Sequence, residues 1–192
     1  MLAPLGFGSG QVDPDAVVAF NSDNPGLLTA WNTTIYIVNA LALAVLVVAL
    51  SRMQSQTPDW AAVSQALGLI WAALVLGAGM IANVALERAA VLAPTDAETA
   101  AEIWFTLHAV ELGLGGGNEI AGGAWIGCVS LAGLLGHSLN MVTVGLGLVT
   151  SAGGLATLVP SLGDTAGVVF GLGAIAWFLA VGLSLFVKQA KS

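Results

Sequence analysis

Glu119 is the residue of this sequence whose surroundings most clearly suggest chemistry. It is the only charged side chain between Leu112 and Gly136, in a stretch that is mostly apolar and rich in glycine. An ionised carboxylate that faces lipid near the centre of a bilayer costs about 2.5–3.5 kcal/mol. We therefore expect Glu119 to face other helices, with Asn83 or Asn118 within hydrogen-bonding distance. Two roles are open for it: a site for a proton, a cation or a basic ligand, or a packing contact between helices.

Further polar side chains fall in the same half of the predicted membrane helices as Glu119. If they converge, they line a cavity that opens to the outer side of the membrane and admits a small molecule or an ion. The alternative is helix packing, in which polar side chains bond across the interface and small residues let the backbones approach. Both interpretations are open for the whole set, which comprises Tyr36, Asn39, Asn83, Glu87, Asn118 and Glu119.

His108 and Glu111 form a second candidate for chemistry. They are three residues apart, which places them on one face of a helix. Imidazole and carboxylate are ligands for zinc, iron or manganese, and Glu119 or Glu87 would have to complete such a set. The alternative is an interfacial histidine that is simply paired with Glu111. No cofactor is predicted apart from this alternative of a metal ion.

The composition excludes most other classes of protein. Of the 192 residues, 57% are hydrophobic and only 8% are charged, against roughly 25% charged residues in an average soluble domain. The net charge of −7 argues against nucleic acid as a partner. The single cysteine, Cys128, allows neither an internal disulfide nor a thiolate metal cluster. The chain is therefore predicted to be an integral membrane protein rather than a soluble enzyme, a secreted disulfide scaffold or a disordered chain.

Long apolar windows predict an all-α, polytopic bundle with five membrane spans. A helix rises about 1.5 Å per residue, so about 20 residues cross the ~30 Å hydrocarbon core of a bilayer. We predict one transmembrane domain over residues 28–192, preceded by an outer segment over residues 1–27. The expected spans are residues 28–50, 61–87, 117–136, 139–159 and 165–187.

The third apolar region is about twice as long as one span, and we expect it to form a single long helix. Arg52, Lys188 and Lys191 lie on one side of the membrane if this region crosses once, which the positive-inside rule favours. Residues 97–116 then extend the third span beyond the outer interface, and Thr95–Asp96 supplies the helix N-cap. This topology places the C-terminus in the cytoplasm and the chain in the inner membrane of a prokaryotic cell.

The N-terminal residues combine a short apolar segment with a polar loop. Residues 1–8 are apolar but too short to span a membrane, and they lack the basic start of a signal peptide. Residues 9–25 are expected to form a polar loop on the outer side. The apolar segment is either the exit of a sixth, N-terminal helix that is missing or incomplete here, or a segment that lies on the membrane. Both alternatives are open.

The order of these features resembles an uncharacterised family of small bacterial membrane proteins with six helices. The resemblance rests on the long helix, in which Thr106-Leu107-His108 is followed by the Gly- and Trp-rich Gly122-Gly123-Ala124-Trp125. It covers the chain from about Phe20 to Val187 and implies an architecture without any established activity. The sequence differs from the family in lacking a complete first helix and in carrying three glycines before Asn118.

Three classes of function are consistent with this pattern. The sequence favours a non-catalytic component of a membrane complex, an accessory or partner-binding protein that contacts lipid and either other membrane subunits or further copies of itself. Short predicted loops, glycine-rich helix faces and the lack of a known catalytic motif indicate this class. The alternatives are a carrier for a small molecule or an ion around Glu119, and an intramembrane metalloenzyme that uses His108, Glu111 and Glu119.

Overall fold

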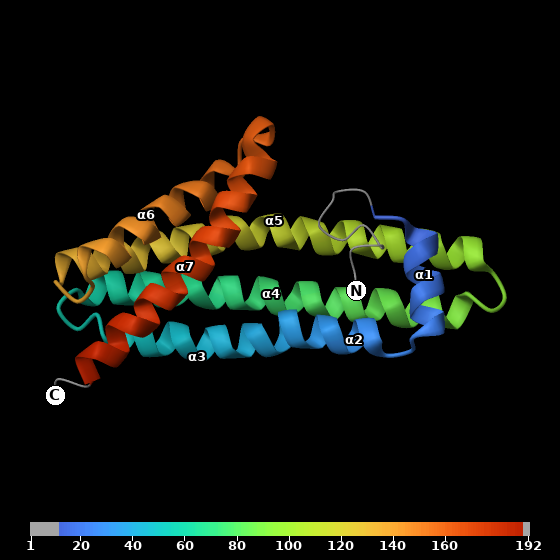
Figure 1. Ribbon diagram of the computed structural model, residues 1–192, viewed down its shortest axis with the longest axis horizontal. Helices are drawn as coiled ribbons and strands as arrows, with labels where there is room; N and C mark the ends of the chain where they lie inside the picture. The colour runs from blue at the N-terminus through green and yellow to red at the C-terminus, as the bar shows by residue number, and fades with distance from the viewer. Residues whose placement is uncertain (1–11, 190–192) are drawn as a thin grey trace. The chain divides into compact units, whose positions relative to one another are not determined.

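The computed structural model describes residues 12–189, except for the side chains of residues 115–117 and 187–189. All secondary structure in this range is helical, which confirms the predicted all-α class (Figure 1). The elements are α1 (Pro14–Asp23), α2 (Leu27–Asn32), η2 (Thr33–Val38), α3 (Asn39–Arg52), α4 (Pro58–Leu92), α5 (Ala97–Leu135), α6 (Met141–Ala156), η3 (Pro160–Leu162) and α7 (Gly163–Gln189).

Four helices in the described residues are long and apolar enough to cross a membrane. The elements α2, η2 and α3 run on as one of them, and η3 continues into α7 as another. Each of the four overlaps one of the predicted spans, and the spans predicted for residues 117–136 and 165–187 end one residue beyond the corresponding membrane-length segments. Their bounds are Leu27–Arg52, Pro58–Leu92, Ala97–Leu135 and Pro160–Phe186.

The helix α6 is shorter than the span predicted for residues 139–159. It has 16 residues, which rise about 24 Å and fall short of the ~30 Å hydrocarbon core. Its start is set by Asn140, whose side-chain oxygen accepts a hydrogen bond from the Thr143 N–H at 2.9 Å. Its end at Ala156 precedes a turn into η3, which begins at Pro160. The count of five spans therefore stays a prediction.

The helix α5 is continuous over 39 residues, which confirms the single long helix predicted for this region. It begins where a capping residue was expected: Asp96 Oδ1 accepts a hydrogen bond from the Thr99 N–H at 3.0 Å. The Asp96 Oδ2 atom also accepts a bond from the Thr99 hydroxyl at 2.7 Å. These two bonds stabilise the ionised carboxylate and lower the pKa of Asp96 below its usual value.

The helix α1 lies within residues 9–25, where a polar loop was expected, so that expectation was wrong for Pro14–Asp23. Asp13 caps this helix by accepting bonds from the N–H groups of Asp15 and Ala16, and Pro14 occupies the first turn. Burial of Val17 and Val18 stabilises α1 against its neighbours. A helix of ten residues is marginal on its own, and this tertiary contact has no signature in the local sequence.

The chain divides into two compact units, and each is described by itself. Unit 1 comprises Met1–Ala40 and Val75–Gly115, and unit 2 comprises Leu41–Leu74 and Gly116–Ser192. The core of unit 1 joins α1 and α2 to parts of α4 and α5. Its buried residues are Val17, Val18, Leu28, Ala85, Leu86, Ala89, Ala100 and Trp104.

The core of unit 2 is a cluster of aromatic rings. The ring centroids of Trp71 and Trp125 lie 5.4 Å apart, and those of Trp125 and Trp177 lie 5.5 Å apart. Phe178 stacks on Trp71 with an interplanar angle of 11°. Gly122 makes this packing possible, because a Cβ atom there would overlap the ring of Trp71. Close approach at glycine is the packing interpretation that the sequence offered for these helix faces.

Candidate functional site: a buried Tyr–Glu–His network

The segment η2 is one turn of π-helix within the first long helix of unit 1. Such turns are rare in proteins overall. Those that occur are often found at functional sites, because the extra residue redirects the side chains around it. Here the turn carries Tyr36, which packs against Gly79 of α4 so closely that a Cβ atom on Gly79 would overlap the Cβ atom of Tyr36. The side chain of Tyr36 therefore depends on both a backbone irregularity and a glycine on the neighbouring helix.

Tyr36, Glu111 and His108 form a hydrogen-bonded network in unit 1. The Tyr36 hydroxyl donates to Glu111 Oε1 at 2.8 Å. The second carboxylate oxygen, Oε2, lies 2.7 Å from His108 Nδ1. His108 and Glu111 are both buried. Because each carboxylate oxygen has a partner, the network satisfies a buried polar group that would otherwise be costly in apolar surroundings.

Trp104 links this network to the core of unit 1. Its ring stacks on the imidazole of His108, with centroids 4.7 Å apart and an interplanar angle of 19°. Trp104 is itself buried in the cluster that contains Val17 and Leu28. The orientation of His108 is therefore fixed from two sides, by the Glu111 carboxylate and by a core indole ring.

The other residues of unit 1 that were predicted to line a cavity, Asn83, Glu87 and Asn39, differ in hydrogen bonding and in burial. The Asn83 amide donates to the Thr33 hydroxyl of η2 at 3.1 Å, and its buried Oδ1 atom has no hydrogen-bond partner among the described residues. Glu87 and Asn39 are exposed. The Asn83 side chain is therefore bonded to the π-turn that carries Tyr36.

Asn118 and Glu119 belong to unit 2. The Asn118 carbonyl oxygen accepts a hydrogen bond from the indole N–H of Trp71. The Glu119 carboxylate lies beside Gly167 of α7, with Oε1 3.1 Å from the position of a Cβ atom on that glycine. Within the described part of the chain the Glu119 side chain has no hydrogen bond, and the side-chain oxygen of Asn118 bonds to Trp71 instead of to Glu119. The predicted polar cavity, which combines residues of both units, stays a prediction.

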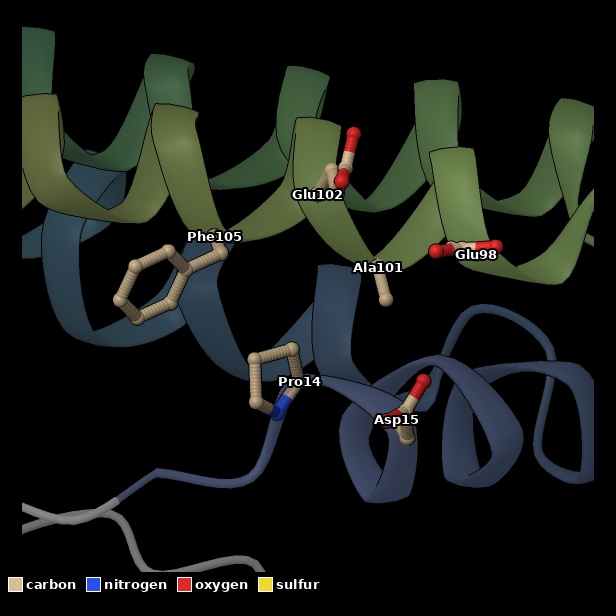
Figure 2. A pocket seen from close by; sticks show the side chains of 6 residues that line it. All are labelled: Pro14, Asp15, Glu98, Ala101, Glu102 and Phe105. Atoms are coloured by element: carbon tan, nitrogen blue, oxygen red, sulfur yellow. The ribbon is translucent and has the colours of Figure 1, made fainter.

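A pocket of about 370 Å³ lies between α1 and the first turns of α5, within unit 1. The side chains of Pro14 and Asp15 point from α1 toward α5, as Figure 2 shows. Three of the six lining side chains are carboxylates, which makes the pocket electronegative. The sequence could not indicate it, because one wall is the helix α1. Its lining residues are Pro14, Asp15, Glu98, Ala101, Glu102 and Phe105.

The pairing of His108 with Glu111 agrees with the simpler of the two interpretations of these residues. No group of three or more His, Cys, Asp or Glu side chains suited to a metal ion occurs in the described residues. The metal hypothesis for His108 and Glu111 stays a prediction. The contact that the sequence missed is the one between Tyr36 and Glu111, which are 75 residues apart.

Comparison with known proteins does not show a family for this chain. No protein-family model, curated protein or solved structure matches this chain. The resemblance to a six-helix membrane family therefore stays an expectation that rests on residues 106–108 and 122–125.

Proposed function

We propose that this chain is a multi-pass integral membrane protein without catalytic activity, which serves as an accessory or partner-binding component of a membrane complex. The observation that carries the proposal is the outward face of α7, which exposes large apolar side chains from Val168 to Phe186. The exposed fraction is 66% for Leu172, 65% for Leu179 and 73% for Phe186. A contiguous apolar surface of this kind is typical of contact with lipid or with another protein.

The arrangement of the polar side chains supports the same proposal. Glu111 is paired with Tyr36 and His108, and Asn118 is paired with Trp71. In membrane proteins such bonds hold helices together. Polar groups that satisfy each other within the protein are less suited to catalysis than groups that converge on an open cavity.

Purification of the full chain from its native membranes in a mild detergent tests this proposal. The chain is expected in the carbonate-resistant membrane fraction, together with another membrane protein or further copies of itself in a fixed ratio. The same chain purified from a heterologous host controls for nonspecific association. Recovery from native membranes as a single copy, without any protein in fixed ratio, would contradict the proposal.

A second candidate is a carrier for a cation or a small molecule at Glu119. It is favoured by one observation, namely that this carboxylate has no hydrogen-bond partner among the described residues. Flux of a cation into vesicles that contain the purified chain, abolished by Glu119→Gln, would support it. Vesicles without flux would rule it out.

A further inference from the structure

The Glu119 carboxylate lies on an open face of unit 2. Glu119 is half-buried, and its carboxylate lies beside Gly167 of α7. One turn to either side, Gly163 and Gly171 have no atom within 4 Å of the position that a Cβ atom would occupy. Glycines spaced four residues apart leave room for another helix to approach α7 closely. The carboxylate therefore borders a row of small residues on α7.

The Glu119 carboxylate has no cationic partner among the described residues, where the single salt bridge joins His108 to Glu111. The chain has four basic residues, Arg52, Arg88, Lys188 and Lys191, and all of them lie at the ends of apolar windows. A second copy of this chain consequently offers no basic side chain within an apolar window. Ionisable side chains within membrane helices almost always pair with one another or line water-filled cavities.

We propose that Glu119 and the glycine face of α7 form a docking site for a partner membrane helix that carries a lysine or an arginine within its apolar segment. The cationic side chain pairs with the Glu119 carboxylate beside Gly167, while Gly163 and Gly171 admit the partner backbone. This inference rests on the proposed function as an accessory component and specifies the chemistry of the partner.

A synthetic transmembrane peptide of leucine and alanine, with one lysine in its outer half, provides the probe. The full chain is reconstituted in phosphatidylcholine vesicles, and binding is measured by energy transfer between dyes on the peptide and on the C-terminus of the chain. The lysine peptide is expected to bind about tenfold more tightly than the same peptide with leucine at that position. Glu119→Gln is expected to abolish this preference, and Glu119→Asp to retain part of it.

Glu98→Gln is the matched control, because it removes an exposed carboxylate from the same helix and leaves Glu119 in place. It is expected to keep the preference for the lysine peptide, and helix content by circular dichroism establishes that each variant is folded. Equal binding of the two peptides to the parent chain would overturn the proposal. Retention of the preference in Glu119→Gln would overturn it as well.

The native complex separates this inference from the proposed function. Treatment with a carbodiimide is expected to link Glu119 covalently to a lysine within a membrane helix of the co-purifying protein, identified by mass spectrometry of the linked peptides. A partner that co-purifies equally well with Glu119→Gln would contradict the docking site and leave the accessory function standing. A chain without any partner that still prefers the lysine peptide would contradict the accessory function and leave the recognition by Glu119 standing.

Discussion

At the scale of single residues, the Tyr36 hydroxyl joins two segments that are far apart in the sequence, through its bond to Glu111. Removing it in Tyr36→Phe leaves Glu111 Oε1 without its donor and is expected to destabilise the protein by about 1 kcal/mol, the usual worth of a hydrogen bond between membrane helices. Thermal unfolding in detergent measures the change. Thr34→Val serves as a control, because the Thr34 hydroxyl bonds only to the carbonyl of Ala30 within its own helix. Equal effects of the two substitutions would contradict the assigned role of Tyr36.

Two glycines of α6, only two residues apart, are predicted to respond in opposite ways to a methyl group. A Cβ atom on Gly147 would overlap the Ser130 hydroxyl and the Trp177 indole, whereas nothing lies within 4 Å of that position on Gly145. Gly147→Ala is expected to destabilise the protein by about 1–3 kcal/mol through overpacking. Gly145→Ala is expected to leave stability unchanged or raise it by up to about 1 kcal/mol through helix propensity. Chemical denaturation of both variants, compared with the parent, measures the difference.

The residue-scale contacts were the least predictable part of the molecule. The pairing of His108 with Glu111 follows from helical spacing, so the sequence could offer it as an alternative. The bond from Tyr36 has no such local signal, because it depends on a π-turn and on the absence of a side chain at Gly79. For Asn118, the sequence indicated a polar contact but not the partner, since Trp71 is reached only through helix packing.

At the scale of elements, the cap of α5 predicts a dependence of stability on pH. The pKa of Asp96 is lowered in the folded chain by its bonds from Thr99, so folding favours the ionised form. This stabilisation is fully present above the ordinary carboxyl pKa of about 3.9 and is lost as the pH falls through the lower folded value. The protection factors of the amides at the start of α5, which correct for the intrinsic pH dependence of exchange, are expected to decrease in this range in the parent chain. Asp96→Asn should remove that component, whereas Glu98→Gln should leave it intact.

Helices with strong periodic or apolar signals were predictable, and their exceptions have physical reasons. The single helix α5 and its capping residue follow from length and from Asp96. The helix α1 was missed because its stability comes from burial of Val17 and Val18 rather than from its own sequence. The helix α6 was expected to be longer, but Asn140 and Pro160 confine it more tightly than hydropathy alone indicates.

At the scale of the whole molecule, the proposed topology predicts which ends of the helices face the outside of the cell. In a Cys128→Ser background, a cysteine introduced at Ser192 is expected to resist a membrane-impermeant maleimide in intact cells, because the positive-inside rule predicts a C-terminus on the inner side. A cysteine introduced at Asp164, in the first turn of α7, is expected to react. The reverse pattern of labelling would indicate the opposite orientation in the membrane. Labelling of both positions would exclude the proposed topology.

The ring cluster of unit 2 gives this protein an optical signature of its own. Trp71, Trp125 and Trp177 are held in fixed orientations at centroid distances short enough for their electronic transitions to couple. The near-ultraviolet circular dichroism should therefore be intense and should report on the order of this core, separately from the far-ultraviolet signal of the helical backbone. A state that keeps its helices but loses the mutual orientation of these indoles would reveal itself by the loss of the first signal alone.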